Sequence, residues 1–579
     1  YFDQLPIPYR AVAADLVTGE RVVMEEGNLA LAMRASMSVP AVFDPVHWKD
    51  RLLVDGGIVD NLPVDVAREL GADVVIAVDV GAGGLQKEDI KDLLAVVAQL
   101  TNLMILSNVN VQRESLGDGD ILVKPALGEH FSSADFDKSS EGAEIGYVSA
   151  MAQHNDFSSL SLSETAYARY AATIKREAPQ APVIQFVELD NQSQFDDQLI
   201  LRQLDIELGK PLPREQLEED IRLIYGLGFL DMVRYEIVEA DGQKGLRLHV
   251  RQDARGSRYL EWGLDLFTDD LNSGFNLRLG YLKTDLDDLG SEFRIAGQMG
   301  TEKMLVLDLY KYLDPAAEFF LLPRLFGEKR EYVEWIDGEP VAIHEIKQYG
   351  GDMAIGKEFS RHAALSFGLR AVHGELNSSI GEAEPPLTDF ETVEYFADFT
   401  YDRLDDRYFP DNGNFARVQY IGSSRSFGSD DDYGQVTAIG ISAKTFGRHT
   451  LLGVLGVKAT VDSTAPEYSL FTGGGLYQLS GYSRGQLAGQ NFGVATASYQ
   501  YRIVRSRLLP GRIGFSIEYG GVADDWEDLF RDGLVHGSLF AGFNTPIGPA
   551  YLGYGMGEGG VTRWFLKFGQ VFGSPSVIR

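Results

Sequence analysis

The feature that most constrains this chain is a change of hydrophobic period beyond Gln252. From there apolar and polar residues alternate with a period of two, the period of a β-strand with two different faces. In TVEYFADFTY, residues 392–401, one face carries Val393, Tyr395, Ala397, Phe399 and Tyr401, and the other carries Glu394, Asp398 and Thr400. FNLRLGYL and ATASYQYRI repeat the pattern, and about sixteen such segments are separated by turn-rich stretches.

An even number of alternating strands with aromatic residues on the apolar face is typical of an outer-membrane barrel. The alternative is a soluble β-sandwich or propeller. A soluble core, however, would not place charged residues on the inward face of strand after strand. We therefore predict a C-terminal 16-stranded antiparallel transmembrane β-barrel over residues 257–572, located in the bacterial outer membrane.

Two other regions precede the predicted barrel, as expected for a 579-residue chain that is too long for one core. Residues 1–177 mix strand-like runs with amphipathic helices, including a long helix over 85–116, and indicate an α/β domain. Residues 183–252 predict a small β-α-α-β-β module without a catalytic constellation. The chain is thus predicted to be multidomain.

Composition excludes several classes of function. The formal charge of −33 argues against nucleic-acid binding, which needs a basic surface. The absence of cysteine excludes disulfides and zinc-thiolate sites. Nine scattered histidines show no metal-ligand spacing, and Asp430-Asp431-Asp432 fits a solvated loop better than a calcium site. We expect no metal and no cofactor.

The stretch RLLVDGGIVDNLPVDVARELGADVVIAVDVG, residues 51–81, predicts a strand, a sharp turn, a helix and a second strand over 74–80. The second strand is apolar throughout, as in a parallel sheet covered on both faces. Asp55 ends the first strand beside Gly56 and Gly57, where α/β folds commonly place their chemistry. Taken alone, a D-G-G turn fits a structural cap or Asx-turn as well.

Three separate blocks give this region a family resemblance. YRAVAADLVTGE, RASMSVPAVFDPV and LVDGGIVDNLPV resemble patatin-like phospholipases in the order of that family, and the resemblance covers roughly residues 1–175. The family uses a Ser-Asp dyad without histidine. By resemblance, Asp55 is the dyad base, and Gly56 and Gly57 support the turn that carries it.

The two later regions also resemble known families. IYGLGFLDMVRYEIV looks like the segment where a polypeptide-transport-associated (POTRA) domain leaves its second helix. The barrel is similar to the outer-membrane assembly and two-partner-secretion superfamily, because YDRLDDRYFPDNGNFARVQY resembles its D-x-R-D…F-P…G hairpin, with Pro410 and Gly413 in the turn. Together the three resemblances imply a patatin-type (type Vd) autotransporter of Gram-negative bacteria.

The resemblance implies a nucleophilic serine in a G-x-S-x-G turn upstream of Asp55. No such motif precedes Asp55, and Ser36 and Ser38 match non-catalytic serines of the family. We therefore expect the patatin-like domain to lack its N-terminal part, with the serine and the oxyanion loop before Tyr1. The fragment is then expected to be inactive.

One G-x-S-x-G does occur, as GYSRG at residues 481–485, but no helix follows it. Barrels of the resembled superfamily fold a long loop into the lumen with an Arg-Gly-aromatic motif. Gly481 and Tyr482 supply the Gly-aromatic pair, Ser480 stands in place of the arginine, and Arg484 is the candidate inward cation for an acidic wall residue. We do not expect Ser483 to be a nucleophile.

The leading hypothesis is an outer-membrane-anchored or surface-exported lipid acyl hydrolase of the phospholipase A type, whose barrel and POTRA domain mediate insertion and export. Its expected partners are phospholipid substrate, outer-membrane lipid and the barrel assembly machinery, and the resemblance allows a homodimer. The alternative is a translocation or assembly factor with a vestigial patatin domain. The third hypothesis is a soluble, adhesin-like β protein.

Overall fold

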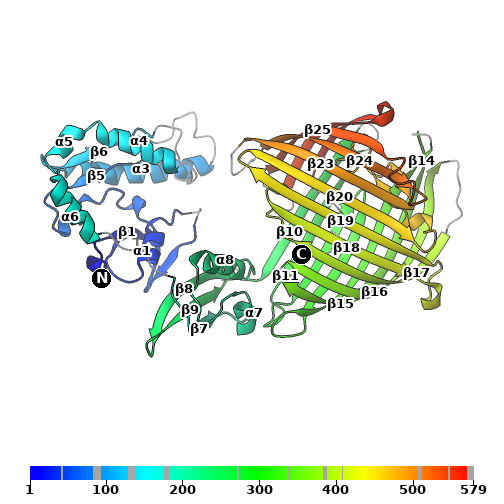
Figure 1. Cartoon of the computed structure of the whole chain (residues 1–579), viewed down its shortest axis with the longest axis horizontal. Helices are drawn as coiled ribbons and strands as arrows, with labels where there is room; N and C mark the ends of the chain where they lie inside the picture. Colours follow the sequence, from blue (N-terminus) through cyan, green and yellow to red (C-terminus); the bar gives the residue numbers. More distant parts are fainter. Residues whose placement is uncertain are drawn as a thin grey trace. The chain divides into compact units, whose positions relative to one another are not determined.

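The computed structural model describes residues 1–40, 43–81, 93–127, 139–174, 181–253, 256–269, 273–336, 339–360, 362–381, 388–406, 408–504, 511–545 and 548–569. The chain divides into two units, residues 1–180 and 181–579 (Figure 1).

A four-stranded antiparallel sheet carries the D-G-G turn in the N-terminal unit. Its order is β2-β1-β4-β3, with β1 Ala11–Asp15, β2 Arg21–Met24, β3 Val46–Trp48 and β4 Arg51–Asp55. Helix α1, Leu29–Ser36, packs on it and begins where the Asn28 side chain accepts a hydrogen bond from the Leu31 N–H at 3.0 Å. Ala13, Ala32 and Leu53 are fully buried between helix and sheet.

The rest of this unit is helical around a two-stranded parallel sheet. The elements are η1 Phe2–Gln4, η2 Gly56–Ile58, α2 Val64–Glu69, β5 Ile76–Val78, α3 Leu93–Glu114, β6 Ile121–Val123, α4 Ser139–Met151, α5 His154–Ser158 and α6 Glu164–Ile174. The predicted α/β class is confirmed. Of the helix predicted over 85–116, residues 85–92 lie outside the described residues.

One detail of the predicted strand over 74–80 is wrong. The strand is only β5, and its Ile76 and Val78 are 49% and 48% exposed while Ala77 is buried. Within the described residues β5 pairs with β6 alone, and the burial of Ala77 beside exposed Ile76 and Val78 differs from the expected burial on both faces. The sheet that carries Asp55 is likewise antiparallel rather than parallel.

The second unit begins with the predicted β-α-α-β-β module. It comprises β7 Phe186–Gln192, α7 Asp197–Leu201, α8 Arg214–Tyr225, β8 Leu230–Ala240 and β9 Gln243–Gln252. The sheet order is β7-β9-β8, parallel between β7 and β9 and antiparallel between β8 and β9. Ile200 of α7 and Ile224 of α8 are fully buried in one cluster with Leu246 and Leu248 of β9.

Sixteen strands in the described part of the chain then close into a barrel, as predicted (Figure 1). They are β10 Arg258–Asp269, β11 Ser273–Lys283, β12 Glu292–Gly300, β13 Lys303–Tyr312, β14 Phe319–Ile336, β15 Glu339–Ser360, β16 Ala363–Gly381, β17 Thr388–Asp402, β18 Gly413–Ser423, β19 Tyr433–Phe446, β20 His449–Val461, β23 Asn491–Val504, β24 Gly511–Ala523, β25 Leu534–Thr545, β26 Gly548–Gly557 and β27 Thr562–Phe568. The predicted barrel end at Phe572 and the tail after it lie outside the described residues.

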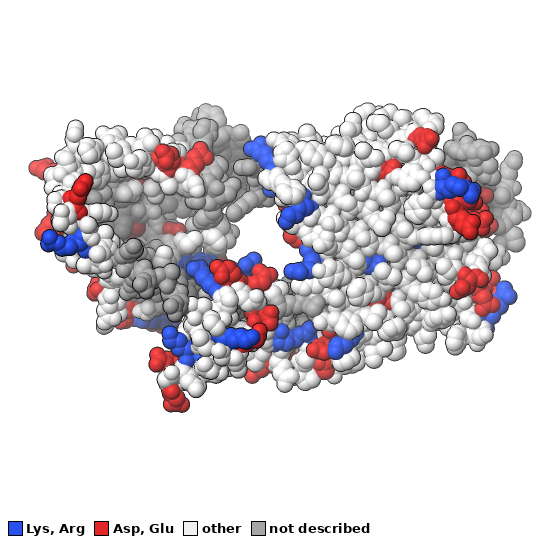
Figure 2. Space-filling model, viewed as in Figure 1, with Lys and Arg blue, Asp and Glu red and all other residues white. Residues whose placement is uncertain are grey.

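The predicted alternation separates a lipid-facing wall from a polar lumen. On β17, Tyr395 and Phe399 are 41% and 37% exposed, whereas Glu394 and Asp398 are buried on the lumen side. Asp398 accepts hydrogen bonds from Arg417 of β18, one of them at 2.6 Å. Figure 2 shows the visible barrel wall almost bare of charge, with Lys, Arg, Asp and Glu gathered near its ends.

Short elements interrupt the barrel connections: η6 Arg425–Phe427, η7 Glu467–Ser469, η8 Glu558–Gly560, and a hairpin of β21 Phe471–Gly473 and β22 Leu487–Gly489. Among the helices that the structure describes, none has the length and apolar character needed to cross a bilayer.

Candidate functional site

The turn after β4 fixes Asp55 at the C-terminal end of an inner strand of the N-terminal sheet. The Asp55 N–H donates to the Ser38 carbonyl at 2.9 Å, and its Oδ1 accepts the Gly57 N–H at 2.7 Å. In the part of the chain that the structure describes, Asp55 Oδ2 has no hydrogen-bond partner. One oxygen therefore anchors the side chain and the other is available for a proton.

Gly56 is required by a close backbone approach, and a side chain at Gly57 would crowd the Asp55 carboxylate. A Cβ atom on Gly56 would lie 2.2 Å from the Val12 carbonyl oxygen on the neighbouring strand. A Cβ atom on Gly57 would lie 2.8 Å from Asn61 Oδ1 and 3.0 Å from Asp55 Oδ1. The chain can pass behind the carboxylate only because these positions carry no side chain.

The surroundings of Asp55 favour its protonated form. Burial raises the pKa of the Asp55 carboxyl, and the Gly57 N–H opposes this with a smaller effect. Arg21 of the same sheet pairs with Asp60 at 2.5 Å and Asp65 at 2.7 Å. A carboxylate whose pKa is raised in this way is a stronger base than an exposed aspartate.

Three serines were considered as the nucleophile from the sequence, and all three occupy structural positions. Ser36 Oγ donates to the Val12 carbonyl at 2.7 Å, and Ser38 Oγ donates to the Arg34 carbonyl at 2.7 Å. Ser483 belongs to the second unit and is 2% exposed. Its buried Oγ has no hydrogen-bond partner among the described residues.

GYSRG lies in the connection between β20 and β23, and the tip of that connection is packed inside the barrel. Tyr477, Leu479 and Ser480 are at most 2% exposed. The Tyr477 hydroxyl accepts a hydrogen bond from Gln500 Nε2 at 3.2 Å, and Thr496 Oγ1 donates to the Tyr477 carbonyl at 3.1 Å. We call residues 462–490 the lumen loop.

Ser480 contacts a wall carboxylate at the place where the resembled motif has arginine. Its N–H donates to Glu518 Oε2 of β24 at 2.7 Å, and its hydroxyl also donates to the Glu518 carboxylate. Gly481 is packed so closely that a Cβ atom would lie 2.7 Å from His536 Nδ1. The Tyr482 ring lies 5.0 Å from the ring of His536.

Arg484 lies against acidic residues of the first barrel strands. Its guanidinium is 3.1 Å from Glu302, in the turn after β12, and 3.9 Å from Asp265 of β10. It also lies over the Phe267 ring at 5.5 Å from the ring centroid. The lumen loop is thus joined to two separate parts of the barrel wall, to β24 by Ser480 and to β10 by Arg484.

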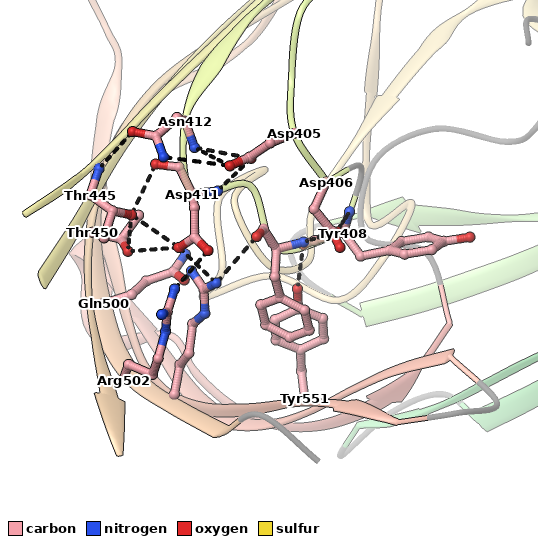
Figure 3. Close-up of polar contacts among 12 residues, drawn as sticks. Asp405, Asp406, Tyr408, Asp411, Asn412, Thr445, Thr450, Gln500, Arg502 and Tyr551 are labelled. Carbon is pink, nitrogen blue, oxygen red and sulfur yellow. Dashed lines mark hydrogen bonds and ion pairs between the residues drawn. The ribbon is translucent and has the colours of Figure 1, made fainter. Parts of the chain in front are cut away.

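A second connection folds inward from the opposite end of the barrel. Because the chain enters β10 from the β-α-α-β-β module and reverses at every strand, the turn 403–412 after β17 lies at the end next to that module. Figure 3 shows the Asp411 carboxylate of this turn beside Arg502, Thr445 and Thr450. Asp411 is 2.6 Å from Arg502 and accepts the Thr445 hydroxyl at 3.0 Å.

The lumen loop and the turn 403–412 are connected through shared wall residues. Arg512 donates to Asp411 at 2.9 Å and to Gln500 at 3.3 Å, and Gln500 in turn reaches Tyr477. A row of aromatic rings forms a second link between the loop and the turn. It consists, in order, of Tyr477, Phe540, Tyr551 and Phe409, and the centroids of successive rings are 5.7, 6.3 and 4.9 Å apart. The sequence indicated the hairpin of residues 401–420 and the loop that contains GYSRG separately, and nothing in it predicted that the two are in contact.

No group of three or more potential metal-ligating side chains is found among the described residues. One cavity of about 900 Å³ lies in the barrel lumen and is lined by charged side chains of β12 to β18 such as Arg324, Asp352 and Arg417.

Comparison with known families assigns all three regions. Residues 6–68 match the family model of patatin-like phospholipases, residues 182–253 match the POTRA model, described as a surface antigen variable number repeat, and residues 289–559 match the Omp85 superfamily domain. The three sequence resemblances are therefore confirmed, the patatin-like one over residues 6–68.

Relatives and solved structures resemble separate parts of the chain. An uncharacterized NTE family protein of Mycobacterium tuberculosis is 49% identical over 76 residues, 13% of this chain and 21% of that protein. Mouse patatin-like phospholipase domain-containing protein 7 is 46% identical over 82 residues, 14% of this chain and 6% of that protein. The chain thus spans about a fifth of the former and less of the latter.

BamA from Haemophilus ducreyi, lacking POTRA domains 1–3, covers 68% of this chain and 85% of its own with a TM-score of 0.49 and 13% identity. CdiB from Acinetobacter baumannii covers 67% and 74% with a TM-score of 0.44 and 10% identity. On the family matches, this chain joins part of a patatin-like phospholipase domain, a POTRA domain and an Omp85-superfamily barrel of the outer membrane.

Proposed function

We propose that the protein is an outer-membrane-anchored lipid acyl hydrolase of the phospholipase A type, in which Asp55 is the base of a Ser-Asp dyad. The observation that carries the proposal is the Asp55 turn, where burial raises the pKa of the carboxyl and Oδ2 accepts no hydrogen bond from any described residue. The NTE and patatin-like relatives support the substrate class.

In this mechanism Asp55 takes the proton of a serine hydroxyl as the serine oxygen attacks an ester carbonyl of a phospholipid. The collapse of the tetrahedral intermediate releases the lysolipid, which receives the proton from Asp55, and leaves an acyl-serine. Water, deprotonated by the same carboxylate, then attacks the acyl carbon, and the serine oxygen leaves with that proton as the fatty acid is released. The proposal requires a nucleophilic serine outside these 579 residues.

The decisive experiment measures fatty-acid release from phospholipid vesicles by the complete gene product. Asp55→Asn keeps the acceptor for the Gly57 N–H and removes the base, so we expect a loss of about 100-fold or more. Asp73→Asn, an exposed carboxylate of the same unit, is the matched control and should leave the rate unchanged. Full activity in Asp55→Asn would refute the proposal.

The 579-residue chain by itself is expected not to hydrolyse esters, because the serine of its G-x-S-x-G is packed inside the barrel. Esterase activity of the purified chain that disappears in Ser483→Ala would overturn this assignment. We further propose that the barrel and the POTRA domain serve the export of the N-terminal unit.

A second candidate function is protein translocation or assembly with a vestigial patatin domain. The POTRA domain and the Omp85-superfamily barrel favour it, since together they account for most of the chain. The same Asp55→Asn comparison separates the two, because a translocation factor would show no phospholipase activity to lose.

A further inference from the structure

The turn that carries Asp55 is held from outside by one side chain of α3. Asn108 Nδ2 donates to the carbonyl oxygens of Gly57 at 2.9 Å and of Ile58 at 3.2 Å. Asn108 Oδ1 accepts the N–H of Asn61 at 3.0 Å. One amide group therefore satisfies three backbone groups of the segment that follows the carboxylate.

The position of Asn108 on its helix explains why it can reach the turn. Asn108 and Gln112 are four residues apart, so they lie on one face of α3. Gln112 Nε2 donates to Asp65 Oδ1 at 3.0 Å, and Gln112 Oε1 accepts the Asp65 N–H at 3.3 Å. The two amides thus bind successive parts of residues 57–65, with Asn108 on the part next to Asp55.

Gly57 couples Asn108 to the carboxylate. Its N–H donates to Asp55 Oδ1 at 2.7 Å, while its carbonyl accepts from Asn108 at 2.9 Å. Gly57 has no side chain to restrain its backbone, and glycine is the most flexible residue in a turn. The hydrogen bond from Asn108 therefore limits where the Gly57 N–H, and with it Asp55 Oδ1, can lie.

We propose that Asn108 is a positioning residue, which clamps the Asp55-Gly56-Gly57 turn and keeps Asp55 Oδ2 directed at the serine. This inference rests on the proposed hydrolase function. It concerns a residue outside the stretch 6–68 that matches the patatin family. Small displacements of a catalytic group cost rate steeply, which makes such a clamp effective.

The test compares variants of the complete gene product in phospholipid hydrolysis. We expect Asn108→Ala to lower kcat roughly 10- to 100-fold with little change in KM, because the base is misplaced and substrate binding is not. The acidic limb of the pH profile should move to lower pH, since water reaching Asp55 reduces the burial that raises its pKa.

Two further variants separate positioning from packing. Asn108→Asp has the same shape but loses both amide hydrogens that serve Gly57 and Ile58, so it should be at least as slow as Asn108→Ala. Gln112→Ala removes the neighbouring amide, which binds Asp65 instead, and should leave kcat and the acidic limb unchanged. Equal losses in Asn108→Ala and Gln112→Ala would overturn the inference.

The same assay distinguishes failure of this inference from failure of the proposed function. If Asp55→Asn abolishes hydrolysis and Asn108→Ala retains the full rate, Asn108 is not a positioning residue and the dyad stands. If Asp55→Asn retains the rate, the hydrolase mechanism is wrong and this inference is wrong with it. In the 579-residue chain, Asn108→Ala should also speed amide hydrogen exchange in residues 55–61, and unchanged exchange would count against the clamp.

Discussion

At the scale of single residues, Asp55 should lower the stability of the folded protein. Burial raises the pKa of its carboxyl, so the folded state binds that proton more tightly than the unfolded state does. The free energy of unfolding therefore falls as the pH rises from the ordinary aspartate pKa of about 3.9 through the raised value. A side chain kept in an unfavourable state at neutral pH is typical of a functional group.

We accordingly expect Asp55→Asn to raise the melting temperature of the N-terminal unit at pH 8. The shift should be roughly 2–4 °C for each kcal/mol gained, and it should shrink as the pH is lowered towards 4. Differential scanning calorimetry of the detergent-solubilised chain measures it, with Asp73→Asn as the exposed control. An unchanged or lower melting temperature at pH 8 would show that the carboxylate is not destabilising.

The sequence predicted the position of Asp55 but only part of its surroundings. D-G-G after an apolar strand indicated a turn with close approaches, and these are to backbone at Gly56 and to side-chain oxygens at Gly57. Asn108 gave no signal, because its partners lie about fifty residues earlier and a polar residue on a helix is ordinarily solvated. The contact of Ser480 with Glu518 was equally hidden, since strand register is set by the whole barrel.

At the scale of elements, the two inward-folding connections should stabilise each other through Asp411. Arg512 is buried and has Asp411 as its charged partner at 2.9 Å. Asp411→Asn leaves this guanidinium without its carboxylate, and we expect a loss of about 1.5–3 kcal/mol in the unfolding free energy of the barrel. Guanidinium-induced unfolding in micelles gives the value.

The double variant Asp411→Asn with Arg512→Gln tests whether the pair acts as one unit. Its cost should be smaller than the sum of the two single costs, because the second change removes the stranded charge. Asp432→Asn in an exposed connection serves as the control and should stay within about 0.5 kcal/mol of the wild type. Strictly additive losses would mean that Asp411 and Arg512 are energetically independent.

The elements themselves were the most predictable level of the structure. Period-two alternation predicted strands such as β17, because lipid on one side and a polar lumen on the other impose opposite demands on successive residues. Burial was harder to predict for β5, because a uniformly apolar run shows neither how long the strand is nor which of its faces is covered. Neither could the alternation show which connections fold into the lumen.

At the scale of the whole second unit, the POTRA domain and the barrel share one hydrophobic core. The apolar side chains of this core come from both domains: Phe195, Leu199 and Phe229 from the POTRA domain, and Tyr312, Ala317 and Phe320 around the barrel turn 313–318.

Polar contacts join the two domains as well. Arg202 of the POTRA domain donates to the Ala316 carbonyl and lies 3.6 Å from Glu358. The Asp196 N–H also donates to the Asp288 carbonyl at 2.8 Å. These contacts hold the two domains together as one packed body.

Ala317 offers the sharpest test of that shared core, because it is fully buried in it and belongs to the barrel. Ala317→Arg introduces a long charged side chain where POTRA residues pack, at a cost of several kcal/mol from overpacking and burial of charge. We expect faster amide hydrogen exchange in α7, whose Leu199 packs in the shared core, while exchange in the barrel strands stays slow. Leu313→Arg changes a 48% exposed residue of the same turn and should leave α7 protected. If α7 is equally protected in both variants, the POTRA domain does not depend on this turn for its packing against the barrel.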